Sequence, residues 1–171
     1  MIIIKKFIIS DMKRYLLILA CVVAAAMGIA LRAQAPESPI RWRMSVKMTS
    51  ATEGVVTLKA TVAPGWHLYS TTLPSSDGPR PTVITFSHPT SMTFTTPLKA
   101  SAAVVEKDDP MFGVRLAWWD TDVTFTRQFT TTSADAPGKV DVKVTFMGCN
   151  DETCLPPATV ELSRTVKPFA K

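Results

Sequence analysis

Short segments in which apolar and polar residues alternate dominate the sequence from Arg43 onward. The clearest is Lys139–Met147, where every second residue from Val140 to Phe146 is apolar and the residues between them are Asp, Lys and Thr. Successive side chains of a strand point to opposite faces, so this period of two predicts a strand with one buried face. The same part of the sequence has no sustained apolar period of about 3.6 residues, so helices are not expected there.

Four further segments alternate in the same way and are also expected to be strands: residues 55–62, 83–87, 123–129 and 158–166. Seven or eight short strands over about 125 residues, each with one apolar face, predict an antiparallel β-sandwich. Two stretches break the alternation and are expected to be loops, Ser70–Pro81 and Glu106–Gly113. Loops on a rigid sandwich commonly carry its functional site.

The first 35 residues have the order of a secretory signal. The basic pair Lys13 and Arg14 precedes the apolar run Tyr15–Leu31, and a small-x-small sequence ends at Ala35. We expect cleavage after Ala35 and a true start at Met12. An uncleaved membrane anchor is the alternative, because the apolar run is 17 residues long.

Residues 36–171 are expected to form a single exported domain, because their number suits one hydrophobic core. Residues 1–35 contain five of the 19 basic residues and one of the 14 acidic residues, so the remainder has a net charge of only +1. A nucleic-acid-binding domain needs a basic surface. This charge balance therefore argues against nucleic acid as a partner.

Two cysteines, Cys149 and Cys154, lie in the loop GCNDETCLPP between two expected strands. Since Cys21 lies in the signal, the exported part has one close pair, which is expected to form a disulfide at least part of the time. If the flanking strands pair as a hairpin, the two cysteines face each other across its neck. Asp151 and Glu152 lie between them, and their charge would raise the pKa of a neighbouring thiol.

The residues themselves leave three interpretations of this loop open. In the first, the pair is a structural disulfide, but closing so short a loop would stabilise the fold by only about 2 kcal/mol. Because this stabilisation is small, the second interpretation, a redox-active pair, is favoured. In the third, the cysteines bind a metal ion, as in a metallochaperone. Such a site needs further ligands, and His67 and His88 are the only histidines. Because their spacing suggests no site, no metal is expected.

Three stretches, in this order along the chain, resemble the N-terminal periplasmic domain of the DsbD thiol:disulfide interchange proteins. They are PGWHLYS at Pro64–Ser70, DPMFG at Asp109–Gly113 and the cysteine loop with its trailing prolines, Gly148–Pro157. The cysteine loop is the most specific of the three. The resemblance extends over nearly all of residues 36–171.

The resemblance implies an immunoglobulin-like sandwich in the periplasm that relays electrons by thiol–disulfide exchange, as a component of a protein-disulfide reductase system. The implied donor is a thioredoxin-like domain fed by a membrane thiol transporter. The implied acceptors are periplasmic oxidoreductases or cytochrome-maturation proteins. No cofactor is expected, because the two cysteines carry the electrons. The alternative is a non-catalytic sandwich that binds a protein, with the bridge as a small structural disulfide.

By position, Cys154 matches the family's cysteine that forms the mixed disulfide with a partner, and Cys149 matches the one that resolves it. The cysteines are separated by four residues here, where the best-known members of the family have five.

The resemblance also assigns the residues around the pair. Asp109, Met111 and Phe112 match the cap loop that shields the cysteines, and His67 and Tyr69 match two tyrosines beside the site. Met111 stands where an aromatic residue is familiar, and His67 replaces a tyrosine.

Overall fold

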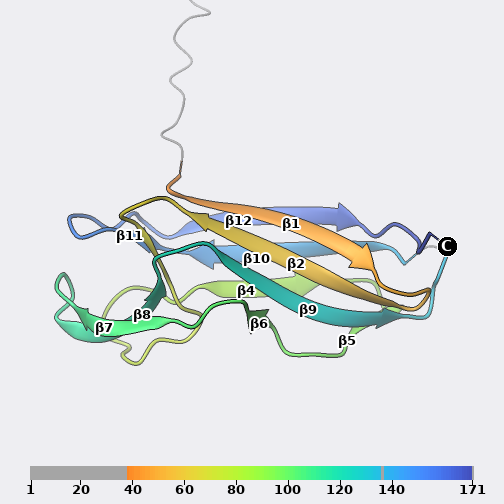
Figure 1. The fold of residues 1–171 in the computed structure, drawn as a ribbon, viewed down its shortest axis with the longest axis horizontal. Helices are drawn as coiled ribbons and strands as arrows, with labels where there is room; N and C mark the ends of the chain where they lie inside the picture. Colours follow the sequence, from red (N-terminus) through yellow and green to blue (C-terminus); the bar gives the residue numbers. More distant parts are fainter. Residues whose placement is uncertain (1–37, 136, 171) are drawn as a thin grey trace, which may run out of the picture. The chain divides into compact units, whose positions relative to one another are not determined.

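The computed structural model describes residues 38–135 and 137–170, which form twelve β-strands and no helix (Figure 1). This part of the chain accordingly offers no helix that is long and apolar enough to span a membrane. The expected signal, with its cleavage point at Ala35 and the start at Met12, lies outside the described residues.

The first sheet is antiparallel and has the strand order β1-β2-β9-β5, with β6 also paired to β9. Its strands are β1 (Ile40–Met48), β2 (Glu53–Val62), β9 (Val123–Thr131), β5 (Met92–Phe94) and β6 (Lys99–Ala100). Alternate residues of β2 and β9 are buried, as the period of two predicts.

Two smaller antiparallel sheets complete the domain. The first has the order β12-β10-β4, formed by β12 (Ala158–Thr165), β10 (Lys139–Phe146) and β4 (Val83–Ser87). The second has the order β11-β3-β8-β7, formed by β11 (Gly148–Cys149), β3 (His67–Tyr69), β8 (Val114–Trp119) and β7 (Val105–Asp109). Figure 1 shows β11, β7 and β8 at the same end of the sandwich.

One hydrophobic core joins the sheets. Trp42 of β1 stacks on Phe125 of its own sheet at 5.8 Å between ring centroids and meets Phe146 of β10 at 5.7 Å. Val140, Val142, Val144 and Phe146, the apolar residues of the clearest expected strand, are all buried in this core. The sheets therefore pack face to face, and the predicted all-β sandwich is confirmed.

Two expectations about the elements need correction. The described residues contain twelve strands rather than seven or eight, because several are only two or three residues long. The stretch Glu106–Gly113 is not wholly a loop, since its first residues belong to β7. β7 pairs only with β8 and is an edge strand, so Glu106, Lys107 and Asp108 remain exposed although they are in a strand.

Candidate redox site

The cysteine loop connects β10 to β12 and lies at the closed end of the hairpin that they form. Its last paired residues are Phe146 and Ala158, and beyond them Cys149 and Cys154 form an antiparallel bridge. Their Cα atoms are 4.1 Å apart and a disulfide joins their sulfurs. The expected position of the two cysteines across the neck of a hairpin is therefore confirmed.

The loop between the cysteines is an Asx turn. The Asn150 side-chain oxygen accepts hydrogen bonds from the backbone N–H groups of Glu152 at 3.0 Å and Thr153 at 2.7 Å. Two backbone bonds close the turn, from Asn150 to Thr153 and from Leu155 to Gly148. These local hydrogen bonds hold the two cysteines at a fixed separation.

The two cysteines differ in exposure. Cys149 is 1% exposed and lies opposite His67 in the β11–β3 ladder, whereas Cys154 is partly exposed. Cys154 is therefore the more accessible residue of the pair, while Cys149 lies inside the domain.

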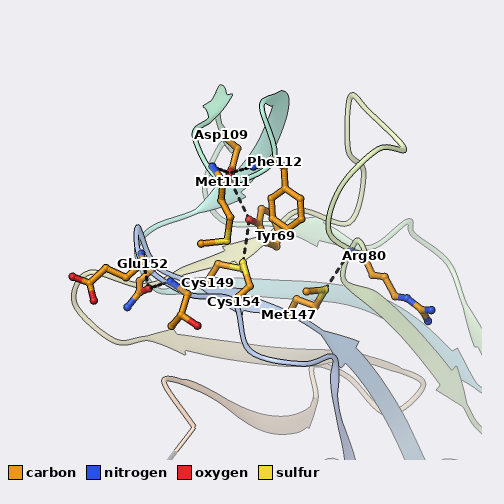
Figure 2. The surroundings of a disulfide bond; sticks show 11 residues. Tyr69, Arg80, Asp109, Met111, Phe112, Met147, Cys149, Glu152 and Cys154 are labelled. Atoms are coloured by element: carbon orange, nitrogen blue, oxygen red, sulfur yellow. Dashed lines mark hydrogen bonds between the residues drawn. A yellow bond between two sulfur atoms is a disulfide. The ribbon is translucent and has the colours of Figure 1, made fainter.

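Tyr69 lies between the disulfide and the β7–β8 turn. Its hydroxyl donates a hydrogen bond to Oδ2 of Asp109 at 3.1 Å and lies 4.0 Å from the Cys154 sulfur (Figure 2). Both Tyr69 and Asp109 are buried. Burial, with smaller effects from the charge and hydrogen bond of Asp109, raises the pKa of Tyr69, so the hydroxyl stays protonated and remains a donor at neutral pH.

The cap loop, residues 109–113, is a turn organised by Asp109. Oδ1 of Asp109 accepts the backbone N–H groups of Met111 at 2.9 Å and Phe112 at 3.1 Å, and the Asp109 carbonyl accepts that of Gly113 at 2.8 Å. Gly113 closes the turn with a φ of 67°, a backbone conformation that suits glycine. One carboxylate therefore holds both the cap backbone and the Tyr69 hydroxyl.

The two cap side chains occupy different surroundings. Phe112 is partly buried and meets the Tyr69 ring edge-on at 6.5 Å between centroids. Met111 is 43% exposed, and Figure 2 shows its side chain directed toward the disulfide. The cap therefore places one ring against Tyr69 and one exposed thioether on the side of the disulfide.

His67 lies next to the disulfide, because β3 pairs it with Cys149 of β11. Its ring contacts Tyr69 edge-on at 5.0 Å and Trp118 at 4.9 Å between centroids. Its Nε2 atom is buried and makes no hydrogen bond to the described residues. Burial lowers the pKa of His67, and the charges of Asp109, Asp151 and Asp120 oppose this shift only in part.

The site can now be compared with known proteins. The family model of the thiol:disulfide interchange protein DsbD, N-terminal, matches residues 34–165, which is most of the 171-residue chain. The chain belongs to the DsbD N-terminal domain family.

Two solved structures are similar to this DsbD N-terminal family member. The N-terminal periplasmic domain of ScsB from Proteus mirabilis has a TM-score of 0.55 at 16% identity, over 79% of this chain and 50% of that one. The reduced DsbD N-terminal domain of Neisseria meningitidis has a TM-score of 0.48 at 16% identity, over 78% of this chain and 90% of that one. No curated protein matches the sequence. The domain is thus an immunoglobulin-like sandwich of the DsbD N-terminal family, a thiol–disulfide interchange domain with Cys149–Cys154 as its disulfide pair.

The structure brings all seven predicted site residues of this DsbD N-terminal domain to one place, although they come from three separate stretches of sequence. It also adds residues that the sequence did not indicate as part of the site. The sulfur of Met147 accepts the backbone N–H of Arg80 at 3.3 Å, and Trp118 stacks on His67. The Arg80 donor is a backbone N–H group, so no side-chain pattern in the sequence indicates this bond.

A pocket of about 260 Å³ opens between the cap and the cysteine loop of the DsbD N-terminal domain, and neither cysteine lines it. Its lining includes Trp66, His67, Trp118, Met111 and Asp151. The described residues contain no group of three or more His, Cys, Asp or Glu side chains that would hold a metal ion. Of the two histidines weighed as ligands, His88 contacts Phe94 of β5 instead of joining the site.

Proposed function

We propose that this domain relays electrons by thiol–disulfide exchange, taking them from a thioredoxin-like reductant and passing them to oxidised extracytoplasmic proteins. The observation that carries the proposal is the asymmetry of the disulfide, in which Cys149 is buried and Cys154 is partly exposed beneath a small cap. An exchange protein needs one sulfur that partners can reach and one that stays inside the domain.

Reduction begins when a partner thiolate attacks the Cys154 sulfur in line with the disulfide. The bond between the two cysteines breaks, Cys149 leaves as a thiolate and takes up a proton, and a mixed disulfide joins Cys154 to the partner. A second thiol of the partner then attacks the partner's own sulfur, which releases Cys154 reduced. Two electrons have entered the domain, and no cofactor takes part.

Onward transfer runs the same steps in reverse. The Cys154 thiolate attacks the disulfide of an acceptor, and Cys149 then attacks the Cys154 sulfur and frees the reduced acceptor. Tyr69 supports this step, because its hydroxyl lies 4.0 Å from Cys154 and can turn its one proton from Asp109 to the thiolate that forms there.

The cap must open for either partner to approach. Met111 and Phe112 are held to Asp109 only through their backbone N–H groups, so their side chains can turn aside while the turn keeps its hydrogen bonds. In the closed position they protect Cys154 from stray thiols and oxidants, which gives the relay its specificity.

We place the domain in the periplasm as residues 36–171 of a secreted precursor. The order of residues 13–35 supports export, and the similar ScsB domain is described as periplasmic. The proposed donor is a thioredoxin-like domain or a membrane thiol transporter. The proposed acceptors are periplasmic oxidoreductases or proteins of cytochrome c biogenesis.

Trapping of mixed disulfides tests the assigned roles. The variant Cys149→Ser keeps the Cys154 thiol, which attacks a partner disulfide, but lacks the thiol that resolves the mixed disulfide, so we expect it to accumulate covalent complexes with the disulfide form of a thioredoxin-like protein. The matched variant Cys154→Ser keeps only the buried thiol and is expected to trap far less. Equal trapping by the two variants, measured on non-reducing gels, would contradict the assignment.

A further inference from the structure

Met111 differs from every other methionine of the described residues in its exposure. Its side chain is 43% exposed, whereas Met44, Met48 and Met92 are 5% exposed or less. Met147 is partly buried, and its sulfur accepts the Arg80 N–H. The thioether most accessible to a dissolved oxidant is therefore the one on the cap.

The position of Met111 links this exposed sulfur to the disulfide. Its backbone is fixed by the hydrogen bond to Asp109, and Figure 2 shows its side chain directed toward the two cysteines. It also lines the pocket of about 260 Å³ between the cap and the cysteine loop, which gives a small oxidant access to this residue. A chemical change on this side chain alters the cover of Cys154 without breaking the cap turn.

We propose that Met111 is an oxidation site, at which a peroxide-class oxidant forms methionine sulfoxide and thereby uncovers Cys154 for reduction. The inference rests on the proposed exchange function, because it concerns access to the same disulfide. It assigns to the cap a second role, in which oxidative conditions speed the return of the domain to its dithiol form.

The chemistry balances with hydrogen peroxide alone. The thioether sulfur attacks one peroxide oxygen, the O–O bond breaks, and a proton transfer releases water, so the sulfur is oxidised by two electrons and the peroxide is reduced by two. The cysteines of the closed form are already joined in a disulfide, which leaves Met111 as the exposed reduced sulfur at the site.

We expect the sulfoxide of Met111 to leave the position that the thioether occupies. Oxidation turns a flexible apolar side chain into a polar one, which favours water over a position facing the disulfide. Phe112 stays anchored against Tyr69, so only part of the cap is lost. We therefore expect the disulfide to be reduced about twofold or more faster in the sulfoxide form, because Met111 then no longer shields Cys154.

Limited peroxide treatment of the purified disulfide form tests the site itself. Trypsin releases Met111 in the peptide 108–115 and Met147 in the peptide 144–164, so mass mapping separates the two sulfurs. We expect the peptide of Met111 to gain one oxygen before those of Met44, Met48, Met92 and Met147. Oxidation of any of these four at an equal rate would overturn the proposal.

The rate of disulfide reduction by dithiothreitol tests the consequence. Each protein is compared before and after treatment, so that only the ratio of the two rates matters. Wild type is expected to accelerate, Met111→Leu to keep its rate, and the control Met147→Leu to accelerate like wild type. Methionine sulfoxide reductases should restore the original rate.

An unchanged or slower rate in oxidised wild type, or the same acceleration in Met111→Leu, would overturn the inference. Such a result is separable from a failure of the exchange function. Trapping by Cys149→Ser is measured on untreated protein, and it succeeds or fails whatever happens at Met111.

Discussion

Two buried residues, Tyr69 and Asp109, connect the disulfide to the cap loop. The Tyr69 hydroxyl donates to Asp109 and lies near the Cys154 sulfur, while the other oxygen of Asp109 accepts two backbone N–H groups of the cap. Both side chains are buried, so each needs the other as a hydrogen-bond partner. The pair therefore couples the position of the cap to the surroundings of the cysteines.

The variant Tyr69→Phe removes this hydroxyl and leaves the ring. We expect the free energy of unfolding to fall by about 1.5–3 kcal/mol, because the lost bond is made to a buried carboxylate. Thr82→Val is the control, since it removes a buried hydroxyl that donates to a neutral acceptor, the Tyr69 carbonyl, at 2.6 Å. Urea unfolding of the disulfide forms measures both losses, and a loss in Tyr69→Phe no larger than that in Thr82→Val would refute the role of Asp109.

His67 gives the domain a pH-dependent stability. Burial lowers its pKa below the ordinary value of 6.5, so on acidification the unfolded chain takes up a proton that the folded domain resists. The stability that neutral His67 contributes is fully present above pH 6.5 and is lost as the pH falls below this value. Unfolding in urea at about pH 7 and about pH 5.5 should therefore show wild type losing more stability than His67→Phe. Equal losses in the two proteins would show that His67 does not contribute.

The site residues were only partly predictable from the sequence. Cys149 and Cys154 are marked by their own loop, but Tyr69 and Asp109 are 40 residues apart and no spacing joins them. Their assignment came from resemblance to a family, and their contact became visible only in the fold. The bond from Arg80 to Met147 spans 67 residues and uses a backbone donor, so no side-chain pattern indicates it.

Among the secondary-structure elements, the short strand β11 positions the cysteine loop. It pairs with β3 through Gly148 and Leu68, and Gly148 lies directly against the buried side chain of Ile40. A Cβ atom at position 148 would lie 2.9 Å from Cγ1 of Ile40, closer than such contacts occur. Glycine at this position therefore allows the cysteine loop to lie on the core.

Gly148→Ala is expected to lower the free energy of unfolding by about 1–3 kcal/mol, because either Ile40 or β11 must shift. Gly78→Ala is the matched control, since its Cβ would meet Leu116 and Phe112 at ordinary distances of 3.6 and 3.7 Å. That change should stay within about 0.5 kcal/mol of wild type. Urea unfolding measures both variants, and equal stabilities would show that β11 is free to move away from the core.

Most of the longer elements were predictable because alternation is a local signal, but β1 and β8 were not among the segments expected to be strands. The β2, β4, β9, β10 and β12 strands all lie where the period of two placed them. Strands of two or three residues, such as β11 and β3, are too short to show a period and exist because neighbouring strands pair with them. β7 was missed because its charged residues face solvent on a sheet edge, where sequence patterns resemble those of loops.

In the molecule as a whole, the main hydrophobic core and the redox site are two separate clusters of residues. The main hydrophobic cluster lies between the sheets and includes Trp42, Phe125 and Val142, whereas Tyr69, Leu116 and Cys149 form a second cluster around the disulfide. The bridge closes a loop of only a few residues, which stabilises the fold by about 2 kcal/mol in the chain-entropy model. The sandwich should therefore remain folded when the disulfide is reduced.

The equilibrium reduction potential of the Cys149–Cys154 pair tests the central claim most directly. The purified protein is equilibrated against a dithiothreitol or glutathione series, and circular dichroism follows the fold in both redox states. An electron relay predicts a potential well above roughly −300 mV with the sandwich intact as disulfide and as dithiol. A potential well below that value, or unfolding on reduction, would contradict the account and make the bridge a structural disulfide.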